Sequence, residues 1–217
     1  MLQLLKKYVF FLFLFILPSI TFSQGKISEA VEFNNKHIPR ILEKEIKKAL
    51  SYFPELKYTA IDFVVKNNIK NNVMQAQPRV RTLFKNRLKR TYKIKISRNL
   101  VLNDTIKAIE NVPTEIIVGW IAHELGHIMD YLDRSAFQMI GFGFRYVTSK
   151  PFLRKAERKA DVYAIRHGLA DEIIETKKFI LYQEDLTDAY KEKIDRLYIS
   201  PEEVEAIQAE IESNETL

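Results

Sequence analysis

Residues 120–129 read WIAHELGHIM and contain His123, Glu124 and His127. An α-helix turns by about 100° per residue, so the two histidines would lie one turn apart along the axis and only about 40° apart around it. Both imidazoles could then bind one metal ion, while Glu124, at the edge of the same face, could hold a water molecule beside that ion. Apolar residues surround the motif, and Pro113 suits a first helical turn. The sequence therefore predicts a buried helix that carries a metal site.

A third ligand is expected, because a catalytic zinc site has three protein ligands and keeps a position for water. Asp133 follows His127 by six residues, as a ligand does in some metzincin-like enzymes, but an unbroken helix would turn it about 240° away. Glu157 is the stronger candidate, in a second expected helix over residues 155–165. Asp161 follows at i+4 on the same face and could accept a hydrogen bond from a ligand histidine. A solvated charged face is the alternative for both carboxylates.

The HELGH motif and the ExxAD motif about thirty residues later resemble those of the gluzincin metallopeptidases, in particular the prenyl-protease-like branch and the short minigluzincins. The resemblance covers residues 92–168. It implies that His123, His127 and Glu157 are the zinc ligands. It also implies that Glu124 is the general base and that Asp161 supports a ligand histidine.

Gluzincins also have an edge strand next to the active helix. Residues 90–97 alternate polar and apolar side chains, which predicts a half-buried strand. In the family this strand pairs with the extended backbone of the substrate. An ordinary edge strand, protected by Lys93 and Lys95 against aggregation, is the alternative.

The remaining pattern predicts an α+β fold: a small mixed β-sheet with an edge strand packed on the HExxH helix, a second zinc-ligand helix and further C-terminal helices. We expect one domain over residues 24–217, with the catalytic core at about 58–170. The other expected elements are a helix at 38–52, strands at 58–65 and within 73–84, a flexible aromatic loop at 137–147, and two charged helices after Asp171, the second with a capping box at 200–203. The loop could line a cleft, contact a membrane or pack in the core. The small side chains of the second motif helix should allow close helix packing: Ala156, Ala160 and Ala164.

Amide hydrolysis needs a hydrogen-bond donor to the developing oxyanion besides the metal. His167 is one candidate, although its position before Gly168 equally suits the end of a helix. Tyr163 and Tyr146 are further candidates. His37 is expected at the surface.

Residues 1–23 have the three parts of a secretory signal: two lysines, an apolar run over residues 8–17, and small residues ahead of a cleavage site between Ser23 and Gln24. We therefore expect export to the periplasm or the medium, with an uncleaved N-terminal membrane anchor as the alternative. The chain has no cysteine, which excludes disulfides, a lipoprotein anchor and thiolate ligands.

The formal charge of +6 falls to +4 without the two signal lysines. No basic cluster with interleaved aromatic residues resembles a nucleic-acid surface, so no nucleic-acid partner is expected. The basic residues from Lys85 to Arg90, with Arg79 and Arg81 nearby, could meet anionic lipid or polymer, or form a solvated face.

Together these features predict an exported zinc metallopeptidase that hydrolyses peptide or protein substrates with a zinc-activated water and Glu124 as general base. One alternative is a non-catalytic binding or assembly protein that retains the gluzincin fold. Another is a metal-dependent hydrolase of a non-peptide amide.

Overall fold

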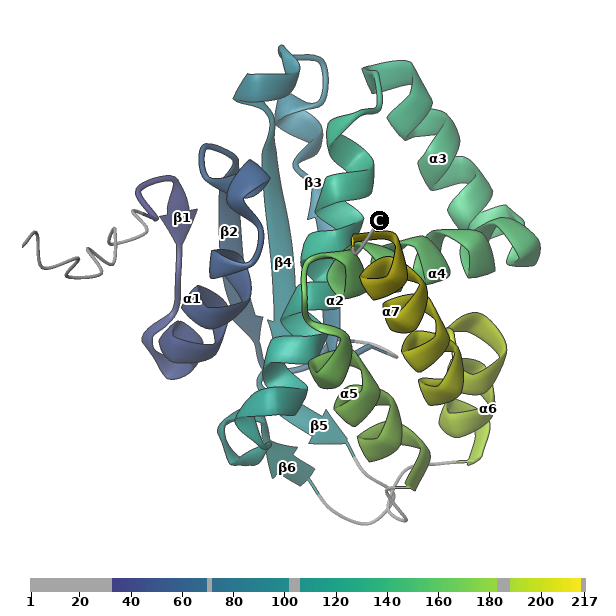
Figure 1. Ribbon diagram of the computed structural model, residues 1–217. Helices are drawn as coiled ribbons and strands as arrows, with labels where there is room; N and C mark the ends of the chain where they lie inside the picture. The colour runs from purple at the N-terminus through teal and green to yellow at the C-terminus, as the bar shows by residue number, and fades with distance from the viewer. Residues whose placement is uncertain (1–32, 70–71, 102–105, 183–187, 216–217) are drawn as a thin grey trace, which may run out of the picture. The chain divides into compact units, whose positions relative to one another are not determined.

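A mixed β-sheet and a layer of helices make up the computed structural model, which describes residues 33–69, 72–101, 106–182 and 188–215 (Figure 1). Contacts group residues 31–217 as one compact unit. The predicted signal segment at residues 1–23 lies outside the described residues. The class expected from the sequence, α+β with a small mixed sheet, is confirmed.

The four-stranded sheet has the order β1-β2-β4-β3, with the first three strands parallel and β3 antiparallel to β4. Its strands are β1 (Lys36–His37), β2 (Ala60–Lys66), β3 (Met74–Pro78) and β4 (Thr91–Ser97). Alternate side chains are buried, among them Phe63 on β2 and Ile94 on β4, which are directly opposite each other. One face of the sheet is therefore apolar and is covered by helices. A separate antiparallel pair is formed by β5 (Asn99–Val101) and β6 (Ile106–Ala108).

The predicted edge strand is at a different position. Residues 90–97 do form a strand, but β4 lies inside the sheet between β2 and β3, so its assignment as the edge strand was wrong. The edge beside the motif helix is β3, which ends at Pro78, a residue that edge strands tolerate because it has no N–H to donate. Period-two alternation identifies the buried face of a strand but not its neighbours.

The described residues form seven α-helices, numbered in chain order: α1 (Glu43–Ser51), α2 (Thr114–Leu132), α3 (Ala136–Thr148), α4 (Lys150–Arg166), α5 (Ala170–Tyr182), α6 (Asp188–Leu197) and α7 (Pro201–Glu215). Short 3-10 turns lie in the connections between these helices and strands, with η3 and η4 both between β3 and β4: η1 (Arg40–Leu42), η2 (Pro54–Leu56), η3 (Val80–Thr82), η4 (Arg87–Lys89) and η5 (Ile109–Asn111). None of the described helices is both long enough and apolar enough to cross a bilayer.

Helix α2 is the central element, in contact with α1, β3, α4 and α5 (Figure 1). Two glycines allow this packing. A Cβ atom at Gly126 would lie 2.3 Å from the Ala160 carbonyl oxygen on α4, and one at Gly119 would lie 2.3 Å from the Glu172 carbonyl oxygen on α5. The close approach of the alanine face of α4 to the motif helix is thus confirmed.

The aromatic segment 137–147 was predicted to be a flexible loop. This prediction was wrong, because the segment lies within α3. Ser135 and Gln138 form a capping box that begins this helix. Met139 and Phe142 are buried on one side of it, while Gly141 and Gly143 border open space. Helical side-chain periodicity therefore outweighs the two glycines.

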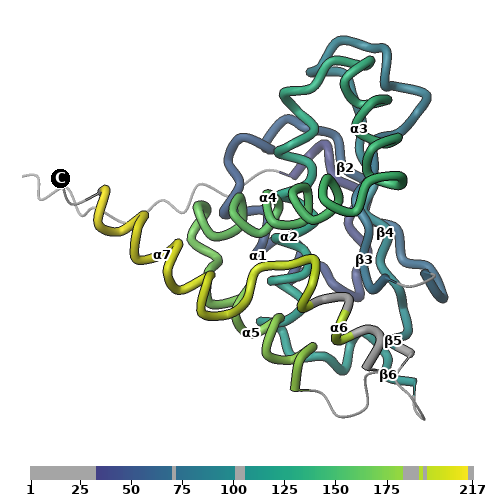
Figure 2. The backbone as a smooth tube through the Cα atoms, turned by 90° about the vertical axis from the view of Figure 1, so that its right-hand side faces the viewer, coloured from purple at the N-terminus to yellow at the C-terminus, as the bar shows by residue number. Residues whose placement is uncertain are grey.

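The described residues form three helices in the C-terminal part of the chain, α5, α6 and α7, where two were predicted after Asp171. The predicted start of the last helix is confirmed, since the Glu203 N–H donates to Ser200 Oγ over 3.2 Å. Helices α5 and α7 pack against each other, and α7 also contacts α4 (Figure 2).

Candidate metal centre

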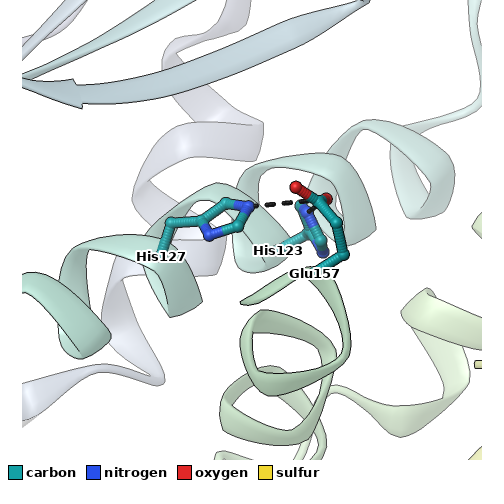
Figure 3. Close-up of side chains that lie close together, drawn as sticks. All are labelled: His123, His127 and Glu157. Carbon is teal, nitrogen blue, oxygen red and sulfur yellow. Dashed lines mark hydrogen bonds and ion pairs between the residues drawn. The ribbon is translucent and has the colours of Figure 1, made fainter. Parts of the chain in front are cut away.

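Three buried side chains meet between α2 and α4: His123, His127 and Glu157 (Figure 3). Glu157 Oε2 lies 3.2 Å from His123 Nε2 and 3.6 Å from His127 Nε2. One ligand atom from each residue lies within 4.8 Å of the other two. Two imidazole nitrogens and one carboxylate oxygen at these separations can bind one metal ion.

The two helices hold these side chains rigidly. The histidines occupy successive turns of a helix that is buried along nearly its whole length. On the other side of the centre, Ser149 caps α4 and Pro151 follows in its first turn, so that Glu157 lies in the middle of a regular helix. Buried Asp130 on α2 also pairs with Lys159 on α4, which ties the two helices together one turn from the ligands.

Asp161 supports the first histidine, as the resemblance implied. His123 Nδ1–H donates to Asp161 Oδ1 over 2.8 Å, so Nε2 is the ring nitrogen that faces Glu157. The second oxygen, Asp161 Oδ2, accepts from Lys177 Nζ on α5 at 2.7 Å. Burial would raise the pKa of Asp161, but the Lys177 ammonium and His123 hold it below its usual value. Asp161 is therefore a carboxylate anion that fixes the orientation of the His123 ring.

Opposing effects set the protonation of the metal-free cluster. Burial would lower the pKa of His123, but Asp161 and Glu157 raise it to about 10. Burial would raise the pKa of Glu157, but the two histidines lower it well below its usual range. Without a metal, the cluster thus keeps a proton on His123 between two carboxylates. A metal ion would have to displace this proton.

Glu124 faces the cluster from the flank of α2, as its position in the motif predicts. Its Oε2 accepts a hydrogen bond from the Ala76 N–H of the edge strand β3. Burial, more than any other effect, raises the pKa of this carboxyl. A carboxyl with a raised pKa that is held beside three candidate metal ligands is suited to accept and return a proton.

A cleft of about 370 Å³ opens beside the cluster. The edge strand β3 lines one side of it and α3 another, with Glu124, His127 and Glu157 in its wall. The Val73 carbonyl accepts from Ser97 N–H and Arg79 N–H donates to the Thr91 carbonyl, so odd-numbered residues near β3 pair with β4. The backbone of Ala76 is directed away from β4 and toward the cleft.

Tyr146 completes the wall from α3. Its hydroxyl donates a hydrogen bond to Glu157 Oε1, the oxygen that does not face the histidines. The residue was one of two tyrosines considered as oxyanion donors, and the structure places it beside the candidate ligand Glu157 and in the wall of the cleft.

His167, the histidine considered as an oxyanion donor, lies outside the metal-binding group, which corrects that assignment. It caps the C-terminal end of α4, with Nδ1 2.6 Å from the Tyr163 carbonyl oxygen and Nε2 3.2 Å from Glu55, and it stacks on Phe53. Gly168 after it has φ of 77°, the left-handed conformation that ends many helices. His167 thus has the structural role that was the alternative to catalysis.

Two other side chains considered from the sequence are also outside the cluster. Asp133 is exposed at the C-terminal end of α2, and His37 is exposed on β1. Neither belongs to the metal-binding group found among the described residues.

Lys177 is the functional residue that sequence reasoning missed. A signal was present, because Lys177 interrupts an apolar stripe on α5 at the helical spacing of Ile173, Ile174 and Ile180. A lysine in such a stripe requires a buried anion, which Asp161 provides.

No family model, curated protein or solved structure matches the chain. The function of this protein therefore follows from the residues of the site alone.

Proposed function

We propose that this protein is a zinc-dependent metallopeptidase that hydrolyses peptide bonds in the cleft between β3 and α3. The observation that carries the proposal is the buried cluster of His123, His127 and Glu157 with Glu124 beside it. A structural zinc site would have four protein ligands, whereas three ligands next to a cleft leave a position for water or substrate. The donor set fits zinc, which accepts imidazole and carboxylate ligands, and the chain has no thiolate to offer.

Each residue has a defined task in this proposal. His123, His127 and Glu157 would hold the ion, and Asp161 would keep the His123 ring in its binding tautomer. A bound zinc ion supplies Lewis acidity, which acidifies water and polarises a carbonyl group. Glu124 Oε2 is held by Ala76 N–H, so Oε1 is the oxygen that would take the proton of the attacking water and return it to the leaving amine.

A peptide is favoured over another amide by the edge strand. The backbone of β3 lines the cleft near Glu124, and an extended peptide could add to this edge by main-chain hydrogen bonds. The neighbouring wall of Met139, Phe142 and Tyr131 offers an apolar surface for a substrate side chain.

The test compares wild-type protein and Glu124→Gln, both without residues 1–23 and both loaded with zinc. Wild type should cleave members of a peptide library, and the variant should bind zinc equally but cleave at least about 100-fold more slowly, because an amide cannot take the proton. Comparable cleavage by the variant would exclude Glu124 as the base. If wild type cleaves no peptide while its zinc site is full, the metallopeptidase proposal is wrong.

A further inference from the structure

Two segments that are far apart in the sequence come together in the fold: residues 79–90, between β3 and β4, and residues 134–155, which contain α3 and the first six residues of α4. Both views place the 79–90 connection beside α3 (Figures 1 and 2). The rings of Phe84 and Phe137 meet edge to face, with centroids 6.3 Å apart. We call the exposed part of these two segments the docking surface.

The docking surface is unusually apolar. Of the eleven large apolar side chains that are exposed among the described residues, seven belong to it, with exposures between 50% and 88%. They are Val80, Phe84, Leu88, Phe137, Ile140, Phe144 and Val147. The last four recur every three or four residues, so they lie within about 80° of each other around α3. Such a gathering of exposed apolar side chains is typical of an interaction site.

The same segments are strongly basic. They contain eleven of the chain's 34 lysines and arginines and none of its 28 acidic residues, so the rest of the chain, with 23 basic residues, has a net charge of about −5. Within the described residues, only Arg79 and Arg134 of these eleven form ion pairs with carboxylates. Arg81, Lys85, Arg87 and Lys89 are exposed.

We propose that the docking surface binds the protein to membranes of anionic phospholipid. Apolar side chains on a helix and an adjoining turn can enter the boundary between headgroups and acyl chains, while the surrounding lysines and arginines pair with lipid phosphates. The opposite side of α3 carries Met139, Phe142 and Tyr146 and lines the cleft. Docking would therefore hold the cleft close to the membrane surface.

A second copy of the chain fits this surface less well. A two-fold symmetric contact would bring the same patch of both subunits together, and their like charges would repel each other. A nucleic acid would match the cations and the aromatic rings, but the aliphatic Val80, Leu88, Ile140 and Val147 offer no stacking face. Anionic lipid uses both the apolar and the basic components.

The experiment is co-sedimentation of the protein without residues 1–23, which keeps the whole described unit, with phosphatidylcholine vesicles that contain about 30% phosphatidylglycerol or none. We expect binding to the anionic vesicles only, and weaker binding as the salt concentration rises. Phe144→Ser combined with Leu88→Ser, and separately Arg81→Glu with Lys85→Glu and Lys89→Glu, should each lower the vesicle partition coefficient at least about 10-fold. All five side chains are exposed, so the variants should unfold at the wild-type temperature.

Matched controls change equally exposed residues elsewhere: Tyr58→Ser with Ile106→Ser, and Lys44→Glu with Lys57→Glu and Lys66→Glu. The controls should bind vesicles as wild type does. The proposal is overturned if anionic vesicles do not retain the wild type, or if the controls lose as much binding as the docking-surface variants. It is also overturned if Phe144→Ser instead dissociates a dimer in vesicle-free solution, or if single-stranded oligonucleotide binds and vesicles do not. Peptidase activity does not enter this test, so its outcome is independent of the proposed function.

Discussion

Lys177 Nζ donates a hydrogen bond to Asp161 Oδ2 over 2.7 Å, and both side chains are buried. Since Asp161 also accepts from His123, the lysine on α5 is linked to the candidate metal centre through one carboxylate. The orientation of a proposed zinc ligand thus depends on a helix that contributes no ligand.

We expect Lys177→Met to reduce the free energy of unfolding by about 3 kcal/mol, because it leaves a buried carboxylate without its cation. Zinc affinity should also fall, by about 10-fold, since Asp161 loses a contact that orients it. Urea unfolding and competitive chelation measure the two effects. Lys178→Met is the matched control, because Lys178 is the next residue, is exposed, and pairs with the exposed Glu175. Equal effects of the two substitutions would contradict a special role for Lys177.

The assignment of the third ligand is tested by Glu157→Ala. This change should remove stoichiometric zinc binding, because two imidazoles alone leave the ion without its carboxylate ligand. Asp133→Ala removes an exposed carboxylate from the end of α2 and should bind zinc as wild type does. Elemental analysis after reconstitution and dialysis measures both. Full zinc occupancy in Glu157→Ala would show that another residue completes the site.

The two helices of this centre were predictable because their signal is local. His123 and His127 are four residues apart, and so are Glu157 and Asp161, and helical geometry alone places each pair on one face. That the two faces meet follows from Gly126 and Ala160, whose small size could be recognised in the sequence.

Contacts between distant segments were less predictable. The order of the sheet places β3 at its edge although residues 90–97 have the clearer strand pattern, because alternation gives no information about neighbouring strands. The hydrogen bond from Ala76 to Glu124 and the ion pair from Lys177 to Asp161 depend on this packing. For α3, the two glycines suggested a loop, whereas the capping box at Ser135 and the apolar periodicity produced a helix.

A pH dependence follows from His123 in the metal-free protein. Its pKa is about 10 in the folded state against an ordinary value of 6.5, so the folded state binds this proton more tightly than the unfolded chain does. The resulting stabilisation should be fully present below pH 6.5 and should be lost as the pH rises through about 10. The difference in unfolding free energy between chelator-treated wild type and His123→Gln should therefore shrink across this range, as measured by urea denaturation. A difference that stays constant or grows would contradict a protonated His123 in the metal-free cluster.

Zinc affinity should change in the opposite direction over the same pH range: it should rise with pH, whereas the stabilisation from His123 falls. A ligand imidazole must be neutral, so the proton on His123 competes with the metal. Apparent zinc affinity should rise with pH up to about 10, and proton release should accompany binding at neutral pH. Isothermal titration calorimetry in buffers of different ionisation enthalpy measures the number of protons released. No proton release at neutral pH would mean that His123 is already neutral before zinc binds.

Tyr146 allows a last prediction that separates two roles of one hydroxyl. The hydroxyl donates to Glu157 Oε1, and it lies in the wall of the cleft, where it could donate instead to a developing oxyanion. If the second role operates, Tyr146→Phe should lower kcat by about 100-fold with little change in KM or zinc affinity, because the lost interaction exists only in the transition state. If the hydroxyl only holds Glu157, zinc affinity should fall and activity should recover at saturating zinc. Tyr163→Phe is the control. The Tyr163 ring lies beside Lys159 and its carbonyl oxygen contacts His167, so this change should leave kcat and zinc affinity unchanged. Measurement of kcat, KM and zinc affinity for the three proteins decides between the two roles.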